Sequence, residues 1–272
     1  MKFQSVFIIF NILLVVFLAI LLMSPALFTS SQLAGVFWKS NWILIIVLGV
    51  ILIGFDIFYF TNRRLYALLE KEDWPALTQY LEDRIIRKGK YTPRLVRLLA
   101  NTYLVLSDSP GVMSLENKAA VAKPSLIEEN ALVFGTARIL GKDITGAIRF
   151  FESRLQSAKA DIRPWIHWYY SFSLLLNRQY EKASEEFSYL ARSSRDGVIA
   201  GLSAYFLGSV IMKSMPAHRA ILEPAAEEGR ERVRASFPRQ LNWAKEVARI
   251  KAEIHTAVLT KYMDEAGIWL YQ

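Results

Sequence analysis

Two long apolar stretches stand out near the start of the sequence. Residues 6–23 contain one strongly polar side chain, Asn11, and residues 42–60 contain one charged side chain, Asp56. At about 1.5 Å of rise per residue, each stretch forms a helix of roughly 27 Å, close to the roughly 30 Å hydrocarbon core of a bilayer. The pattern therefore predicts two transmembrane helices, joined by an extracytoplasmic loop over residues 24–41.

The charges that flank these stretches predict the orientation of the chain. The connecting loop carries one basic residue, Lys39, whereas Arg63 and Arg64 directly follow the second stretch. Because cytoplasmic flanks carry the excess of Lys and Arg, we expect a multi-pass protein of the inner membrane whose N-terminus and C-terminal domain are cytoplasmic. The small residues Ser24 and Ala26 leave signal-peptide cleavage as an alternative, although the apolar core is longer than the usual ~7–15 residues.

Beyond residue 61 the apolar positions follow the period of amphipathic helices, which predicts an all-α region. In this region, pairs of a large residue followed by a small one recur at intervals of 35, 36 and 37 residues. The pairs are Leu99-Ala100, Phe134-Gly135, Tyr170-Ser171 and Leu207-Gly208. Twelve residues after each small member comes a residue of modest size, in order Val112, Ala147, Ala183 and Ala220.

This spacing resembles the tetratricopeptide repeat, a helix-turn-helix unit of 34 residues in which small residues let the two helices approach closely. The resemblance covers residues 62–215 and implies an array of helical hairpins. Residues 216–272 are expected to hold a degenerate last unit, whose second helix Pro224 puts in doubt, and a long capping helix over residues 240–270. The layout is similar to that of HemY-type inner-membrane proteins. A helical bundle without repeats is the alternative.

The segment WIHWYYSF, residues 165–172, contains five aromatic rings. In the register of the resemblance, His167 and Tyr170 pack inside a helix pair, and the other large side chains face a concave groove. The groove is expected to be lined by Trp165, Trp168, Phe172, Leu132, Thr136, Leu202 and Tyr205. Such an apolar patch predicts a protein partner that contributes an apolar peptide or helix, and the alternative occupant is the chain's own terminal helix.

Charged residues near the apolar stretches suggest contact with lipid. The formal net charge of the chain is +8, and a basic stretch follows the predicted anchor. Its residues include Arg84, Arg87, Lys88, Lys90 and Arg94. Basic clusters beside a membrane helix attract anionic lipid, while an acidic partner or a solvated face are the other interpretations. Asp56 lies near the end of its stretch, where Arg63, seven residues later, could pair with it.

No chemical motif in the sequence indicates catalysis. The chain has no cysteine, and it lacks the metalloprotease, phosphate-loop, nucleophile-elbow and dinucleotide motifs. The histidines His167, His218 and His255 are far apart and lack the spacing of metal ligands. No nucleic-acid-binding motif is present either. We therefore expect no catalytic residue, cofactor, metal or nucleic-acid partner.

These observations favour a membrane-anchored cytoplasmic scaffold or adaptor that binds a protein partner. A component of an envelope assembly fits this description. The alternative is a regulatory or transport-accessory protein in which the transmembrane hairpin and Asp56 carry the function. The substitution Asp56→Asn separates these two hypotheses, since only the second requires the carboxylate.

Overall fold

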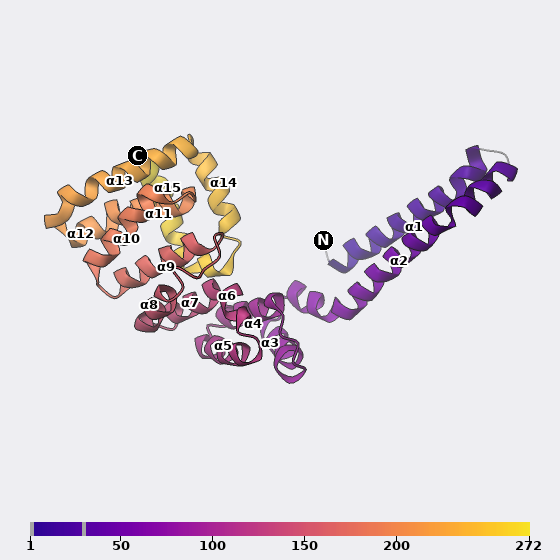
Figure 1. Ribbon diagram of the computed structural model, residues 1–272, viewed down its shortest axis with the longest axis horizontal. Helices are drawn as coiled ribbons and strands as arrows, with labels where there is room; N and C mark the ends of the chain where they lie inside the picture. The colour runs from indigo at the N-terminus through magenta and orange to yellow at the C-terminus, as the bar shows by residue number, and fades with distance from the viewer. Residues whose placement is uncertain (1–2, 29–30) are drawn as a thin grey trace. The chain divides into compact units, whose positions relative to one another are not determined.

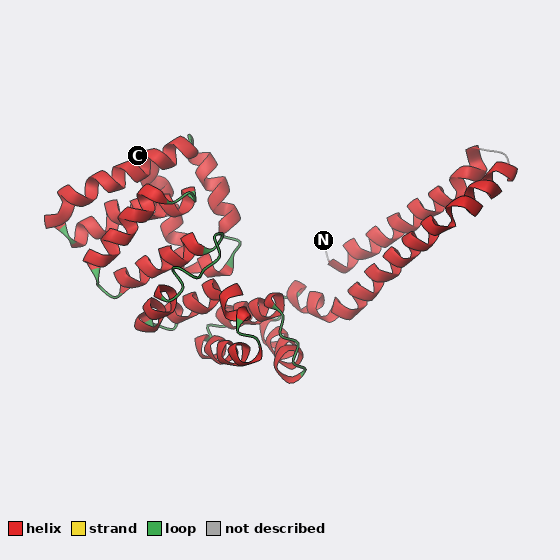
Figure 2. Cartoon of the chain, viewed as in Figure 1, coloured by secondary structure: helices red, strands yellow, loops and turns green. Residues whose placement is uncertain are grey.

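The computed structural model describes residues 3–28 and 31–272, and these residues form helices and connecting turns without a strand (Figures 1 and 2). The prediction of an all-α chain is therefore confirmed for the described residues. The chain divides into two compact units, Met1–Tyr80 (unit 1) and Leu81–Gln272 (unit 2), which are described separately below.

Unit 1 contains a helical hairpin formed by α1 (Phe3–Phe28) and α2 (Ser31–Glu70). The rings of Phe10 and Phe55 lie 5.9 Å apart, so the two helices run side by side. Both helices extend into the predicted loop over residues 24–41, with a non-helical backbone at Asn41. The predicted loop is therefore too long. A hydropathy pattern identifies only the apolar part of a helix. The helix itself can continue beyond that part wherever its backbone hydrogen bonds are satisfied.

Two described helical segments are long and apolar enough to cross a membrane, namely Asn41–Glu70 and Gly197–Ser214. The first contains the predicted span 42–60, and none of its most apolar part is buried. The second is 61% buried, so it is a core segment of unit 2. The predicted span 6–23 lies within α1, where Ile9–Leu21 forms a shorter apolar helix and the side chains of residues 6–8 lie outside the described residues.

Pairs of neighbouring helices make up most of unit 2. The pairs are α4 (Pro93–Val105) with α5 (Ser109–Ala122), α7 (Ala131–Leu140) with α8 (Ile144–Glu152), α9 (Arg163–Leu176) with α10 (Tyr180–Ser193), and α11 (Gly197–Tyr205) with α13 (Arg219–Ser236). The short helix α6 (Ser125–Glu129) precedes α7, and the π-helix Phe206–Ile211 with α12 (Met212–Ser214) follows α11. Each pair also contacts the next one along the chain, as expected for a stacked array.

The turns between paired helices repeat one backbone conformation, which the sequence analysis missed. Glu72, Ser107, Lys142 and Arg178 have φ values of 52°, 58°, 63° and 59°, at intervals of 35, 35 and 36 residues. A left-handed residue of this kind commonly ends a helix, and it is uncommon for residues other than glycine. An aspartate follows in three of the turns and accepts a hydrogen bond from the N–H three residues later: Asp73 from Ala76 at 3.2 Å, Asp108 from Gly111 at 2.9 Å and Asp143 from Gly146 at 2.9 Å. The constant spacing of these turns supports an array of similar hairpins.

The small members of the repeated pairs lie where helices approach closely. A Cβ atom added to Gly135 would lie 2.1 Å from Cζ of Phe151, on the second helix of the same hairpin. Ala100 and Ser171 are also fully buried. Gly208 differs, because a Cβ atom there would lie 2.6 Å from the ring of Trp269, close to the C-terminus.

The C-terminal part of the chain departs from the expected capping helix. Residues 240–270 form α14 (Gln240–Ile250), a 3-10 helix (Ile254–Leu259) and α15 (Thr260–Tyr271), so the prediction of one long helix is wrong. The Thr256 hydroxyl donates to the Ile250 carbonyl at 3.1 Å and the Glu253 carbonyl at 2.7 Å, which satisfies acceptors at the break. The break lets α15 turn back and pack on α14 and α11.

The second helix of the last hairpin is present although Pro224 lies inside it. Helix α13 runs from Arg219 to Ser236 through this proline. Proline removes one backbone donor from a helix, and the packing of α13 against α10 and α11 compensates for that loss.

Candidate functional site

The residues expected to line an open groove are instead inside unit 2. Six of the seven are buried, and Leu132 is half-buried. The buried ones are Trp165, Trp168, Phe172, Thr136, Leu202 and Tyr205. The Trp168 ring, which is 0% exposed, lies 5.1 Å from the Phe172 ring and 5.5 Å from the Phe206 ring. These side chains form an aromatic core.

The chain's own C-terminal segment covers this core. Trp165 lies 5.5 Å from the ring of His255, and Phe172 lies 6.0 Å from the ring of Tyr262. The Tyr205 hydroxyl donates to Glu265 Oε2 at 2.6 Å. The prediction of an open groove at these residues is therefore wrong, because residues 254–271 occupy the place that a partner would take. The alternative occupant considered from the sequence is the one in the structure.

Hydrogen bonds fix the C-terminal segment on the aromatic core. The hydroxyl of Tyr169 donates to the His255 carbonyl oxygen at 2.7 Å and lies 3.1 Å from His255 Nδ1. Burial raises the pKa of Tyr205, and the hydrogen bond to Glu265 raises it further. Both tyrosines are therefore neutral donors at physiological pH.

His167 and the Tyr170 ring face α10, where Lys182 Nζ lies 5.3 Å from that ring, but the Tyr170 hydroxyl reaches Glu152 at the end of α8. His167 Nε2 lies 2.5 Å from Glu186 Oε2, and the Tyr170 hydroxyl donates to Glu152 Oε1 at 3.0 Å. Tyr170 is buried, whereas His167 is half-buried. A histidine paired with a surface glutamate fits a structural role.

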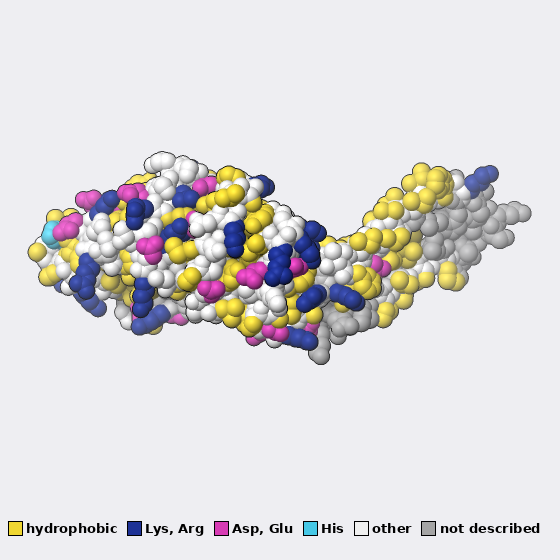
Figure 3. Space-filling model, turned by 90° about the horizontal axis from the view of Figure 1, so that it is seen from below, with side chains coloured by type: hydrophobic (Ala, Val, Ile, Leu, Met, Phe, Trp, Pro, Cys, Tyr) yellow, Lys and Arg dark blue, Asp and Glu magenta, His cyan; other side chains and the backbone are white. Residues whose placement is uncertain are grey.

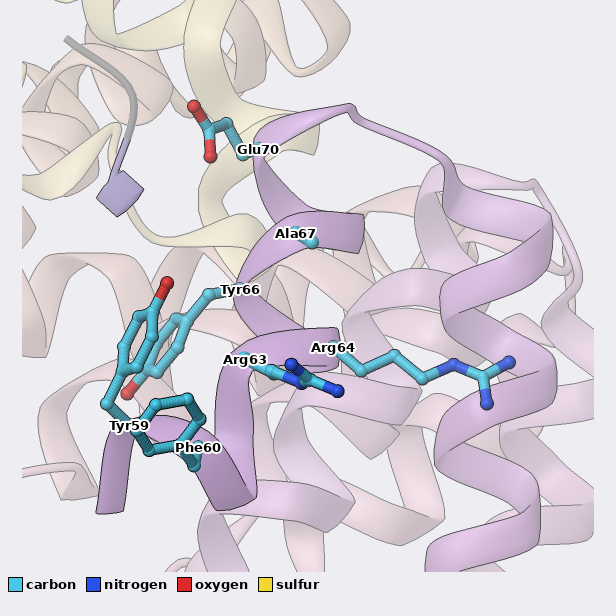
Figure 4. A pocket seen from close by; sticks show the side chains of 7 residues that line it. All are labelled: Tyr59, Phe60, Arg63, Arg64, Tyr66, Ala67 and Glu70. Carbon is cyan, nitrogen blue, oxygen red and sulfur yellow. The ribbon is translucent and has the colours of Figure 1, made fainter. Parts of the chain in front are cut away.

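A pocket of about 470 Å³ lies on α2 beyond the apolar stretch (Figure 4). Its lining residues are Tyr59, Phe60, Arg63, Arg64, Tyr66, Ala67 and Glu70. In Figure 4 the three aromatic rings gather on one side of the helix, while the Arg64 side chain extends to the other side. There the Arg64 guanidinium carbon lies 5.5 Å from the centroid of the Tyr80 ring.

This pocket has the composition of a membrane-interface site. Aromatic rings and arginines are the side chains that anchor helices at the headgroup level, because each has an apolar body and a polar end. The Arg63 guanidinium is exposed and can bind a phosphate through two hydrogen bonds. The sequence analysis selected both arginines, but it overlooked Tyr59 and Tyr66, whose positions follow the aromatic-belt pattern.

Asp56 does not pair with Arg63 in the described part of unit 1, where no ion pair joins them within 4 Å. Seven residues of helix separate them by about 10.5 Å along the helix axis. The expected pairing is therefore wrong. Asp56 is half-buried on the hairpin.

The basic stretch lies at the start of unit 2. Arg84 is half-buried, whereas the other four, Arg87, Lys88, Lys90 and Arg94, are exposed. Lys88 forms an ion pair with Asp83 at 2.6 Å. Solvated surface pairs of this kind contribute little stability.

A polar cleft of about 250 Å³ lies elsewhere in unit 2, and the sequence did not point to it. Its charged walls come from Arg97 on α4, from Asp161 and from Glu253 in the C-terminal segment. These residues are distant in sequence, and the break at residues 251–259 that brings Glu253 here was not predicted. In the part of the chain that the structure describes, no three acidic, histidine or cysteine side chains gather to hold a metal ion.

The protein is all-helical in its described residues. It has an apolar helical hairpin and a series of helical hairpins on which the C-terminal segment packs. The chain belongs to the family described as "Uncharacterised Treponema protein", whose model matches residues 111–272. A relative from Treponema pallidum (strain Nichols), described as "Uncharacterized protein", is 29% identical over 248 residues, which cover 87% of this chain and 78% of the relative. Since unit 2 is less than 87% of the chain, this similarity extends into unit 1. No solved structure matches the chain.

Proposed function

We propose that the protein is a membrane-anchored scaffold, in which α1 and α2 form a two-span anchor and the helical hairpins hold a protein partner at the cytoplasmic membrane surface. One observation carries this proposal. The segment Asn41–Glu70 is a single helix that begins in the apolar stretch, passes the aromatic and basic pocket, and ends just before Glu72, the first of the four repeated turns. The helix of the anchor therefore continues unbroken to that turn.

The surface of the hairpin supports the anchor. Figure 3 shows hydrophobic side chains along the described part of the hairpin on the face in view. Exposed large apolar side chains of α1 and α2 include Leu13, Phe17, Val50 and Ile57. A helix that is apolar on all sides is stable in lipid or inside a larger core, and exposed apolar surface of this extent is unfavourable in water. The Arg63 and Tyr66 side chains next to it are suited to anionic headgroups.

The resemblance of the repeat spacing to the tetratricopeptide pattern supports partner binding, because stacked hairpins present extended surfaces to other proteins. The C-terminal segment fills the aromatic side of the array, so the proposed partner binds the outer helices instead. Exposed apolar residues on those helices include Val121 on α5 and Ile221 on α13.

Carbonate extraction of membranes tests the anchor. Full-length protein is expected to stay with the membrane pellet at alkaline pH, and Ile51→Lys, at the centre of the apolar stretch, is expected to shift it to the soluble fraction. A lysine near the centre of a transmembrane helix costs about 2.5–3.5 kcal/mol. The control is Ile221→Lys, since this isoleucine is also exposed but lies on unit 2. Equal extraction of the wild type and both variants would contradict the anchor.

Site-specific photo-crosslinking in the native host tests the partner. A photoreactive residue at position 121 or 221 is expected to give a discrete protein adduct, and one at the buried position 168 is expected to give none. The absence of an adduct at both exposed positions would refute the scaffold proposal on these helices. A C-terminal reporter that is active only outside the cytoplasm would reverse the orientation.

A further inference from the structure

The polar cleft in unit 2 has two walls of opposite charge. Arg97 and Asn101 on α4 form one wall, and Glu253 and His255 of the C-terminal segment form the other. Asp161, which precedes α9, and Glu129, at the end of α6, add two further carboxylates.

Arg97 is held in place by the protein but keeps free donors. Its Nε donates to Asn130 Oδ1 at 3.3 Å, and its Nη2 donates to the Glu129 carbonyl oxygen at 2.9 Å. A guanidinium has five N–H groups, so three remain for a ligand. Two parallel donors on a planar group match the two oxygens of a carboxylate.

Glu253 supplies the negative charge of the opposite wall. His255, whose Nε2 lies 3.6 Å from Glu253 Oε2, holds the pKa of the carboxyl below its usual value, and the charge of Arg97 lowers it further. Glu253 is therefore ionised at neutral pH. Within the described residues, no ion pair joins Arg97 to Glu253, so the two charges face the cleft without neutralising each other.

Asn101 provides an unused acceptor. Its side-chain oxygen is buried and has no hydrogen-bond partner. A buried carbonyl oxygen without a partner is destabilising, and such groups are rare in folded proteins. Because this oxygen is closed off from solvent, the Asn101 amide turns toward the cleft when a ligand N–H satisfies it.

We propose that this cleft binds a small zwitterion, a free α-amino acid or a molecule of similar size. The carboxylate of the ligand bonds to Arg97, and its ammonium group lies between Glu253 and the Asn101 oxygen. The volume of about 250 Å³ is below the range typical of drug-sized ligands and suits a single amino acid. Because the three carboxylates of Glu129, Asp161 and Glu253 outweigh Arg97, a basic side chain on the ligand strengthens binding and an acidic one weakens it.

Isothermal titration calorimetry on the full chain in detergent tests the proposal with L-lysine, L-glutamine and L-glutamate. We expect affinity to fall in that order. Two blocked probes remove one charge each: N-acetyl-L-glutamine lacks the ammonium group and L-glutaminamide lacks the carboxylate. Each is expected to bind about tenfold to a hundredfold more weakly than L-glutamine, because each loses a charge-assisted contact.

Variants assign the binding to this cleft. Arg97→Gln and Glu253→Gln are each expected to weaken L-glutamine binding by about tenfold or more. The Arg97→Gln variant loses two hydrogen bonds within the protein and could fail to fold. The Glu253 side chain is 65% exposed, so Glu253→Gln is expected to fold normally. Glu223→Gln, at a surface ion pair with Arg219, is the matched control and should bind like the wild type.

Three results would overturn the proposal. The first is no binding of any of the three amino acids at millimolar concentration. The second is equal affinity for L-glutamine and its two blocked forms. The third is unchanged binding in Glu253→Gln. The anchor and partner experiments do not depend on this cleft, so failure here leaves the proposed function standing.

Discussion

The substitution Gly135→Ala tests whether the small member of each repeated pair is required for close helix approach. Helix α7 carries Gly135, and α8 carries the Phe151 ring that lies against it. A new Cβ atom would lie 2.1, 2.4 and 2.9 Å from three atoms of that ring. Carbon atoms without a bond between them pack at about 3.5–4.0 Å, so the ring would have to move by roughly 1.5 Å.

The ring cannot move freely. Phe151 is fully buried, its ring stacks on Tyr169 at 5.5 Å, and it lies 5.7 Å from the Phe150 ring. Overpacking a core in this way costs typically about 1–3 kcal/mol, and three short contacts indicate the upper end. Alanine gains about 1 kcal/mol over glycine in a helix. We therefore expect a net loss of about 2 kcal/mol.

Thermal unfolding followed by tryptophan fluorescence measures this loss. For a domain of this size, 2 kcal/mol corresponds to a decrease in Tm of roughly 4–8 °C. The double variant Gly135→Ala with Phe151→Leu should lose less than the sum of the single variants, because the smaller side chain leaves room for the Cβ atom. A Gly135→Ala protein that melts at or above the wild-type temperature would refute the close-approach explanation of the repeat.

Four further predictions concern the site. Trp168→Ala should destabilise unit 2 by about 3–5 kcal/mol in chemical denaturation, as for a buried aromatic residue, and a wild-type midpoint would place that ring outside the core. Burial and the hydrogen bond to Glu265 raise the pKa of Tyr205, so its contribution to stability is present below pH 10 and is lost as pH rises further. The free energy of unfolding of Tyr205→Phe should therefore fall less steeply at alkaline pH than that of the wild type. Equal slopes of unfolding free energy against pH would contradict this. Arg63→Gln should weaken flotation of the full chain with vesicles that contain anionic lipid but not with neutral vesicles, and equal loss on both would exclude headgroup recognition. Asp56→Asn should leave membrane extraction and crosslinked adducts unchanged, whereas loss of function with assembly intact would favour the regulatory or transport-accessory role.

Local patterns in the sequence predicted the helical hairpins, but they did not predict how the C-terminal segment packs on them. The pair Phe134-Gly135 could be recognised because a large and a small residue at a fixed spacing reflect contacts within one hairpin. The turn conformation at Ser107 and Lys142 escaped notice, since neither residue type favours a positive φ. The break in the C-terminal helix escaped as well, because contacts of α15 with α11 decide it and such contacts leave no local period.

The difference between local patterns and long-range contacts also explains which part of unit 2 is open to a ligand. A helical period shows that Trp165 and Phe172 face inward, but burial against the chain's own helices and burial against a partner require the same apolar residues. The C-terminal segment resolves the choice by covering these rings. It leaves open the cleft between Arg97 and Asn101 on one wall and Glu253 on the other, and there the Asn101 oxygen has no partner. Since apolar surface needs only cover whereas a buried polar atom needs a partner of specific chemistry, the polar end of the concave side is the more informative place to look for a ligand.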